Sequence, residues 1–312
     1  MHLDRREFMK LCAGTAAGAG ISQLAHPAVV QALQTASDGK TPVFWLQGCG
    51  CTGCSVSILN TVHPTIAQVL LDIISMRHHP TIMGGEGDVA INNIYASAEA
   101  NKGKYILMLE GSVPMADERY CIIGERMVNG HHEEYSLTRV LKDLVPGAAA
   151  CVALGACATY GGIPGAEGNL TGAVGLPEFF KKEGIDKPVV NIAGCAPHPD
   201  WMVGTLAYAL KYGVPALVEQ LDEHGRPKMF FGDNIHDNCP YLPKFNEAGF
   251  AKSFNDGSDC KYTLGCKGPI THSDCYKRIW NSGLNWCVEN AVCIGCVEPG
   301  WPDKFSPFYE EL

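Results

Sequence analysis

Residues 42–54 read PVFWLQGCGCTGC, an apolar run that leads directly into a turn with three cysteines. A short apolar run followed by glycines is typical of a strand that is buried on both faces of a parallel sheet. Three more runs of this kind occur at Tyr105–Leu109, Cys151–Leu154 and Pro188–Ile192. Helical patterns lie between or after the runs, at Ile58–Ser75, Thr138–Leu144 and Trp201–Tyr212. This alternation predicts a doubly wound α/β domain over residues 40–225.

The composition narrows the function classes. The chain has 312 residues and a formal net charge of −9, which argues against a nucleic-acid-binding protein. It contains 15 cysteines, an odd number in a chain long enough to form its own core, so a disulfide framework is disfavoured. Only two C-x2-C pairs occur, Cys51/Cys54 and Cys293/Cys296, which is few for zinc knuckles, and neither is followed by the His of a haem attachment site. Iron–sulfur clusters are the favoured interpretation, with disulfides and zinc as the alternatives.

Twelve candidate metal ligands form three sets of four, enough for three four-iron clusters. The first set is Cys51, Cys54, Cys157 and Cys195; the second is His236, Cys239, Cys260 and Cys266; the third is Cys275, Cys287, Cys293 and Cys296. A histidine ligand is neutral, so a cluster in the second set should have the higher potential, other things being equal. The third set has Trp280, Trp286, Trp301 and Phe305 nearby in the sequence, which predicts an apolar shell.

Each ligand of the first set follows a predicted strand. The carboxyl ends of parallel strands meet at one crevice, so we expect Cys51, Cys54, Cys157 and Cys195 to converge there. Cys49 is an alternative to Cys51 by position, although the C-x2-C spacing favours Cys51. Cys121 is interpreted as an inert thiol or as a spare ligand used on oxidation, and Cys151 as a packed core thiol.

Other motifs are given structural interpretations. Gly84-Gly85-Glu86-Gly87 lacks the spacing of a phosphate loop and predicts a turn. The remaining histidines, including His78/His79 and His131/His132, are interpreted as solvated or structural.

The two ends of the chain differ in character from the middle. Residues 4–10 read DRREFMK and precede a short apolar segment, Leu11–Ile21, which resembles a twin-arginine export signal. We therefore predict a signal and linker over residues 1–36 and a periplasmic protein that is exported folded, the alternative being a basic terminus. The segment is too short to span a membrane, and no later run reaches ~18 apolar residues, so no membrane anchor is expected. From residue 226 the strand patterns fade, which predicts a loop-rich iron–sulfur domain over residues 226–312.

In the motifs around its candidate ligands, the chain resembles the small subunit of a nickel–iron hydrogenase. The matching motifs are Trp45-Leu46, Cys51-Thr52-Gly53-Cys54-Ser55, Gly155-Ala156-Cys157-Ala158, Gly194-Cys195-Ala196-Pro197-His198-Pro199, Asp233-x2-His236-x2-Cys239, Leu264-Gly265-Cys266-Lys267-Gly268-Pro269, Asn285-Trp286-Cys287, Cys293-Ile294-Gly295-Cys296-x-Glu298-Pro299 and Ser306-Pro307-Phe308-Tyr309. The resemblance implies a flavodoxin-like first domain and three [4Fe-4S] clusters in line. The first set would be proximal to the nickel–iron centre of a separate large subunit, the third medial and the second distal.

Two positions depart from the pattern of many such relatives. Cys287 stands where many have Pro, so a fourth medial thiolate is available and four irons are expected there. Val56 stands where many have Glu, so a proton route through that carboxylate cannot operate. Both features resemble the nickel–iron–selenium subgroup, which implies selenocysteine in the partner subunit.

The expected function is that of the electron-transfer subunit of a periplasmic hydrogenase. The resemblance implies reversible oxidation of dihydrogen on the partner subunit, with a periplasmic multi-haem cytochrome c as the acceptor. The chain itself is expected to hold no nickel and no catalytic residue. The alternatives are a stand-alone multi-cluster electron-transfer protein and an exported disulfide-bonded binding protein.

Overall fold

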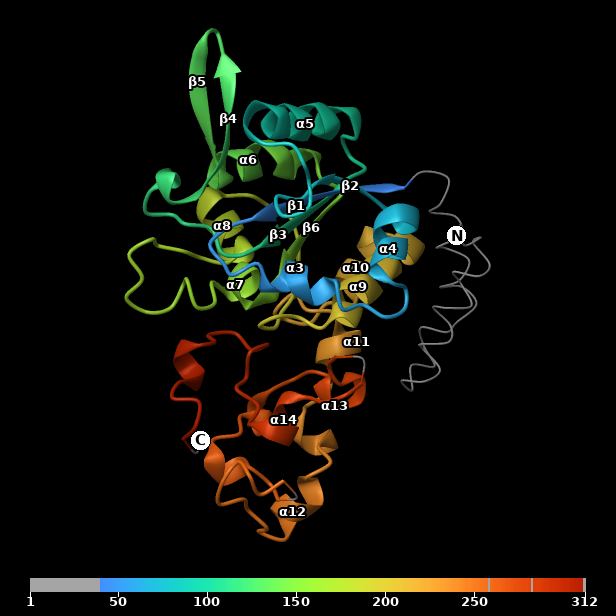
Figure 1. Cartoon of the computed structure of the whole chain (residues 1–312), viewed down its shortest axis with the longest axis vertical. Coiled ribbons are helices and arrows are strands. Elements are labelled where there is room, and N and C mark those ends of the chain that lie inside the picture. The colour runs from blue at the N-terminus through green and yellow to red at the C-terminus, as the bar shows by residue number, and fades with distance from the viewer. Residues whose placement is uncertain (1–39, 258, 282, 311–312) are drawn as a thin grey trace.

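The computed structural model describes residues 40–257, 259–281 and 283–310. Its centre is a five-stranded parallel sheet with the order β2-β1-β3-β6-β7 (Figure 1). The strands are Thr41–Gln47 (β1), Ile74–His78 (β2), Ile106–Glu110 (β3), Ala150–Leu154 (β6) and Val189–Ile192 (β7). Counted along the chain without the hairpin, this is the 2-1-3-4-5 order of flavodoxin-like doubly wound sheets. The predicted fold class is confirmed.

Helices cover both faces of the sheet because neighbouring strand residues point to opposite sides. In β1, Val43 and Trp45 share a buried cluster with residues of α9 and α10. Phe44 and Leu46 share a second cluster with residues of α5, α6 and α8. The helices concerned are Gly87–Ala100 (α5), Leu137–Leu144 (α6), Leu176–Glu183 (α8), Pro199–Tyr212 (α9) and Val214–Glu219 (α10). The predicted helices at Thr138–Leu144 and Trp201–Tyr212 are confirmed, and residues 84–86 form a bend and loop before α5.

The long helix predicted over Ile58–Ser75 is wrong. The chain instead forms α3 (Gly53–Ile58), α4 (Ile66–Gln68), a π turn (Val69–Ile73) and then the edge strand β2. Pro64 disfavours a helical conformation in the residue before it. Thr65 then begins a new helix, with its hydroxyl accepting from the Gln68 backbone N–H at 3.4 Å.

An antiparallel hairpin projects from the sheet region at one end of the molecule (Figure 1). Its strands are Ile122–Val128 (β4) and His131–Ser136 (β5). The sequence patterns did not predict it, because most residues of the two strands face solvent or are only half-buried. Without a buried face, such strands carry no clear alternation of apolar and polar residues.

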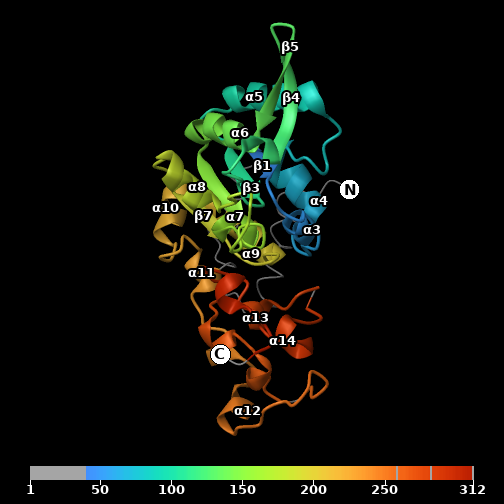
Figure 2. The ribbon, with the colours of Figure 1, turned by 90° about the vertical axis from the view of Figure 1, so that its left-hand side faces the viewer.

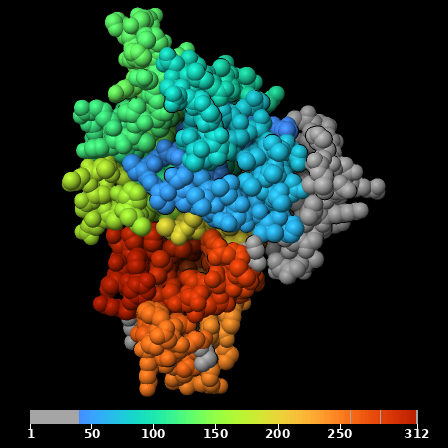
Figure 3. All heavy atoms as spheres, viewed as in Figure 1, coloured from blue at the N-terminus to red at the C-terminus, as the bar shows by residue number. Residues whose placement is uncertain are grey.

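The C-terminal region has no long helix in the part that the structure describes. It contains α11 (Lys228–Phe231), α12 (Leu242–Asn246), α13 (Cys275–Arg278) and α14 (Cys287–Asn290), joined by loops. Short 3₁₀ turns lie at Glu118–Cys121, Val145–Gly147, His236–Asn238, Tyr262–Leu264, Gly268–Ile270 and Asp303–Phe305 along the chain. Figure 2 shows α11 leading from the sheet into this region, and Figure 3 shows the region as the end opposite the hairpin.

The C-terminal region shares its core with the sheet. Phe230, Phe231 and Trp286 belong to the same buried cluster as Trp45 and Trp201. The predicted domain boundary at residue 226 lies next to this shared core, and the division into domains stays a prediction.

None of the described helices is both long enough and apolar enough to cross a membrane. The export signal predicted over residues 1–36 lies outside the described residues, and so does Cys12, a cysteine within that segment.

Candidate iron–sulfur sites

The first set of thiols lies at the carboxyl ends of three strands. Cys51 and Cys54 follow β1, Cys157 lies in α7 (Gly155–Tyr160) directly after β6, and Cys195 follows β7. Burial raises the pKa of Cys54, and the charges of Glu110, Cys157, Cys195 and Cys51 raise it further. Burial, with the charges of Cys195 and Cys51, raises the pKa of Cys157 to about 12. The structure therefore brings all four thiols of this set together.

The carboxylate of Glu110 organises the turn that carries Cys54. Glu110 ends β3 and is buried. One of its oxygens accepts from the backbone N–H groups of Cys54 at 2.8 Å and Ser55 at 3.1 Å. The other accepts from the Trp45 indole at 3.0 Å and from the Ser55 hydroxyl. This carboxylate fixes the start of α3 at the crevice between β1 and β3, where the strand order reverses.

Glycines leave the space that a bulky group would need. A Cβ at Gly155 would lie 2.5 Å from the Cys54 sulfur, and one at Gly162 would lie 2.9 Å from the Cys157 sulfur. Both residues also have positive φ angles, +83° and +56°. Four thiols in a cradle free of side-chain carbon fit an iron–sulfur cluster, which takes one thiolate per iron.

The third set is packed in the C-terminal region. The Cys287 thiol donates to Cys293, which lowers the pKa of Cys293 and raises that of Cys287. The charges of Cys296 and Cys293 oppose ionisation of Cys275, whose pKa is raised chiefly by burial. The Ser273 hydroxyl donates to the Cys275 sulfur at 3.1 Å. The structure thus places all four thiols of the third set together.

Three of the four predicted aromatic residues, Trp286, Trp301 and Phe305, share buried clusters with members of the third set, and the fourth, Trp280, packs against His198 and Trp201. Trp286 packs in the same buried cluster as Cys275 and Cys293. Trp301 and Phe305 pack against Cys296 from another cluster. Cys275 and Cys293 are buried, whereas Cys287 is exposed. The set is shielded on most sides and open at Cys287.

The second set lines one pocket. His236, Cys239, Cys260 and Cys266 all border it. The His236 ring packs edge-on against Phe245, with ring centroids 4.5 Å apart. Burial raises the pKa of Cys239 and of Cys260, and the charge of Lys261 opposes both shifts.

Lys261 is a buried cation beside the second set that the sequence patterns did not single out. Its side chain is almost fully buried, and its Nζ donates to the carbonyl oxygens of Val288 at 3.1 Å and Glu289 at 3.2 Å. A single Lys next to a Cys gives no signal by itself in the sequence. Glu110 was missed for the same reason, since its partners lie 55 or more residues away.

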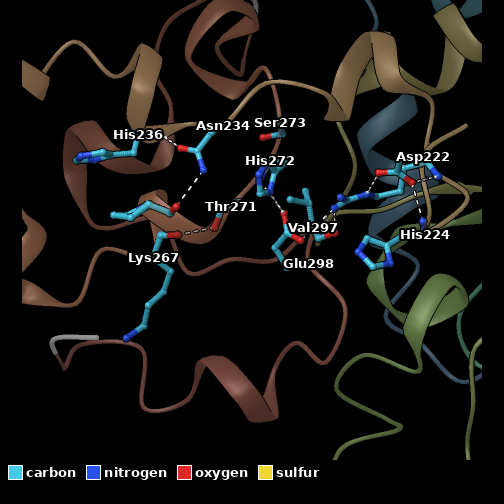
Figure 4. A network of polar contacts seen from close by, with 12 residues as sticks. Asp222, His224, Asn234, His236, Lys267, Thr271, His272, Ser273, Val297 and Glu298 are labelled. Carbon is cyan, nitrogen blue, oxygen red and sulfur yellow. Dashed lines mark hydrogen bonds and ion pairs between the residues drawn. The ribbon is translucent and has the colours of Figure 1, made fainter. Parts of the chain in front are cut away.

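The three sets adjoin in one order: first, third, second. Between the first and third sets, the backbone N–H of Cys195 donates to the Cys296 sulfur, and the Cys195 charge acts on it. Between the third and second sets, the Cys293 carbonyl accepts from the Lys267 N–H at 2.7 Å, next to Cys266. The nearby Thr271 hydroxyl donates to the Lys267 carbonyl at 2.6 Å (Figure 4). The third set is therefore the middle one.

Three further cysteines of the described residues, Cys49, Cys121 and Cys151, are not among the candidate ligands. Cys151 is buried in β6, as predicted for a core thiol. Cys121 lies in a 3₁₀ turn with its sulfur 3.9 Å from the Gln47 carbonyl oxygen. Burial, with a smaller contribution from the charge of Cys49, raises the pKa of Cys121 to about 11. The charge of Cys51 acts on all three other thiols of the first set, Cys54, Cys157 and Cys195. This favours Cys51 over Cys49 as a ligand.

No three His, Cys, Asp or Glu side chains of the described ranges are grouped closely enough to hold a single metal ion. In a four-iron cluster each ligand binds a different iron, so the four ligands do not meet at one atom.

The four other histidines that the sequence analysis singled out are not members of the three ligand sets. His78 and His79 are buried in or beside β2, and His79 contacts the Ser55 hydroxyl at 3.1 Å. His131 and His132 lie on the exposed hairpin. All four fit the structural or solvated roles that the sequence predicts.

Known proteins with similar sequences cover almost the whole chain. A family model for the C-terminal part of the NiFe/NiFeSe hydrogenase small subunit matches residues 231–309. A model of the 20 kDa subunit of NADH ubiquinone oxidoreductase matches residues 51–209. The chain is 54% identical over 314 residues to the periplasmic [NiFeSe] hydrogenase small subunit of Desulfomicrobium baculatum, covering 99% of each. It is 39% identical to the periplasmic [NiFe] hydrogenase small subunit 1 of Nitratidesulfovibrio vulgaris, covering 99% of this chain and 93% of the relative.

Solved structures agree. The [NiFeSe] hydrogenase of Desulfomicrobium baculatum matches with a TM-score of 0.85 and 53% identity, over 88% of this chain and 100% of that chain. The [NiFeSe] hydrogenase of Desulfovibrio vulgaris Hildenborough matches with a TM-score of 0.83 and 55% identity, over 87% and 98%. The chain therefore belongs to the small subunits of NiFe/NiFeSe hydrogenases, the electron-transfer subunits that form a heterodimer with a large catalytic subunit.

Proposed function

We propose that this chain holds three [4Fe-4S] clusters and carries electrons between the large subunit's nickel–iron centre and an external acceptor. The proximal ligands are Cys51, Cys54, Cys157 and Cys195; the medial ligands are Cys275, Cys287, Cys293 and Cys296; the distal ligands are His236, Cys239, Cys260 and Cys266. The observation that carries the proposal is the unbroken order of the three sets, with Cys195 beside Cys296 and Cys293 beside Cys266. A four-iron cluster, when bound, accepts and releases single electrons.

The chain's own residues prepare each site. Glu110 fixes the turn before Cys54, and Gly155 keeps side-chain carbon away from its sulfur. Trp286 restricts water around the medial thiols, which supports a site of low polarity. Lys261 supplies a buried cation beside the distal thiols, and a nearby cation favours the more negative, reduced state of a bound group.

The large subunit is proposed to cover the face that bears the proximal thiols. Cys51 and Cys195 are exposed on it, and so are the apolar side chains of Val56 and Leu59. Exposed apolar side chains around a functional site are typical of a protein interface. Val56 has no ionisable group, so any proton route past this point uses other residues. We propose selenocysteine in that subunit because two of the similar chains belong to [NiFeSe] hydrogenases.

The acceptor is proposed to be a periplasmic multi-haem cytochrome c that docks near the distal site. The site lies in the C-terminal region, at the opposite end of the order from the proximal thiols. The periplasmic location, reached by the twin-arginine route, is supported by the twin arginine at Arg5-Arg6 and by the periplasmic relatives.

The test is anaerobic production of the chain with and without its large subunit. We expect the two subunits to copurify and the complex to reduce a multi-haem cytochrome c with dihydrogen. The chain alone should bind iron but show no dihydrogen turnover, since we propose that the nickel–iron centre lies in the large subunit. An iron-loaded chain that never copurifies with a nickel subunit would support a stand-alone electron-transfer protein instead. Fast reduction of dyes with no reduction of the cytochrome would contradict the proposed acceptor.

A further inference from the structure

A buried arginine joins the sheet to the loop after Cys296. Arg226 is buried, and its Nε donates to the Asp222 carboxylate at 2.8 Å. One of its terminal nitrogens donates to the Val297 carbonyl at 3.1 Å and lies 3.2 Å from the Glu298 carboxylate. Figure 4 shows Val297 and Glu298 facing the side of the network that holds Asp222. Val297 and Glu298 directly follow Cys296 in the chain.

The other end of this link is tied to the strand before Cys195. Arg226 closes a turn with Asp222, in which the Asp222 side chain accepts from the Arg226 backbone N–H at 2.8 Å. The turn is bonded to β7, because the Gly225 carbonyl accepts from the Asn191 N–H at 2.8 Å. Asn191 lies four residues before Cys195. The arginine therefore connects the strand that leads to Cys195 with the residues that follow Cys296.

The charges in the network make the link stiff. One guanidinium faces two carboxylates, the partly buried Asp222 and the buried Glu298. The free oxygen of Glu298 accepts from the His272 backbone N–H at 2.6 Å, and the His272 ring lies 3.2 Å from it. A planar guanidinium can hold several partners at fixed angles, which an ammonium cannot do. Removing the guanidinium alone would leave the carboxylates of Asp222 and Glu298, one partly and one fully buried, without this cation.

We propose that Arg226 is a positioning residue that holds Cys296 against Cys195 and so sets the rate of electron transfer between the proximal and medial sites. The step moves one electron, supplied by dihydrogen through the partner subunit, from the proximal to the medial site, with no bond formed or broken. The inference rests on the proposed function, since it needs a cluster at both sites.

Two changes, each made in the assembled heterodimer, test this role. Arg226→Lys keeps the charge but cannot reach Asp222, Val297 and Glu298 together. The triple change Asp222→Asn, Arg226→Met and Glu298→Gln removes the guanidinium without leaving unpaired carboxylates, so it guards against simple misfolding. Arg139→Lys is the control, because Arg139 pairs with Glu133 on the half-exposed surface of α6.

Four quantities are measured on each heterodimer. They are the iron content, the catalysed exchange of isotopes between D₂ gas and water, the rate of dye reduction by dihydrogen, and the magnetic interaction between reduced clusters in electron paramagnetic resonance. Isotope exchange needs only the partner's nickel–iron centre, so it should stay at the wild-type level, as should iron. Dye reduction should fall several-fold, and the proximal–medial magnetic interaction should weaken, in both test variants but not in the control.

Unchanged dye reduction and unchanged magnetic interaction in both variants would overturn the role of Arg226. Loss of iron or of isotope exchange in both variants would also overturn it, because Arg226 would then serve assembly rather than spacing. Failure of the proposed function would look different, since the wild-type heterodimer itself would then lack iron at these sites.

Discussion

At the scale of single residues, Gly155 sets the room available beside Cys54. A Cβ at this position would lie 2.5 Å from the Cys54 sulfur, so we expect Gly155→Ala to lower iron retention at the proximal site. Gly168→Ala is the matched control, because Gly168 has nearly the same φ (+80° against +83°) but no atom within 4 Å of the added Cβ. The control should lose only about 1–2 kcal/mol from backbone strain. Equal iron content in the two purified variants would contradict the cradle.

Glu110 carries a second prediction at this scale. In Glu110→Gln the uncharged amide can replace only some of the bonds to Cys54, Ser55 and Trp45. Since a hydrogen bond to a charged group contributes about 1.5–3 kcal/mol, we expect a clear loss of thermal stability. We also expect a higher proximal potential, because a negative charge is removed from beside the thiols. Glu118→Gln, at a site bonded to Ser136, is the control; a redox titration with no shift relative to that control would rule out the electrostatic role.

Sequence patterns mark the proposed metal ligands but not the residues that pack around them. The cysteines stand out through their spacing and their places after strands. Glu110, Lys261 and Arg226 do not stand out, because each has a partner far away in the chain: Cys54 at 56 positions, Val288 at 27 and Val297 at 71. Only the fold brings such pairs together, so no local pattern marks them.

At the scale of elements, β2 shows where prediction from patterns fails. The four strands that the sequence predicts are β1, β3, β6 and β7, and nearly all of their residues are buried. Because both faces of these strands are covered, their sequences are continuous apolar runs. β2 lies at the edge, alternates apolar with polar residues and follows a segment with helical spacing. The path of the C-terminal loops could not be predicted from the sequence either. These loops pack around the ligand sets and share a buried core with the sheet, and neither contact leaves a periodic pattern in the sequence.

His78, at the end of β2, gives this element a pH dependence. Burial, with a contribution from His79, lowers the pKa of His78 to about 4 from 6.5. The folded state therefore prefers the neutral ring, and its stability should be complete above pH 6.5 and fall as the pH drops toward 4. The full loss is about 3 kcal/mol.

The measurement compares thermal midpoints of His78→Gln and wild type between pH 7 and pH 4. The variant should lose less stability than the wild type over this range, while His131→Gln on the exposed hairpin should behave like the wild type. Parallel curves for the wild type and His78→Gln would show that His78 does not titrate on unfolding.

At the scale of the whole molecule, the three candidate ligand sets adjoin in one order, which we propose is the path of the electrons. The path begins at the crevice of the sheet and runs through the shared core into the C-terminal region. Its middle step depends on the medial set being complete, and Cys287 is the most exposed member of that set.

Cys287→Pro should convert the medial site to a three-ligand site. Proline is tolerated at the first position of a helix, and Cys287 begins α14, so the fold should survive. The variant should hold about eleven irons instead of about twelve and show a three-iron signal. Cys151→Ala, which removes a buried thiol of β6, should keep the wild-type iron count; an unchanged count in Cys287→Pro would exclude Cys287 as a ligand.

The most direct test of the electron path is the iron content of the wild-type heterodimer, measured together with its electron paramagnetic resonance after oxidation. Three complete sets predict about twelve irons per copy of this chain and no three-iron signal in the intact protein. About eleven irons with a three-iron signal would remove Cys287 from the medial site. Negligible iron in protein purified without oxygen would contradict the path as a whole.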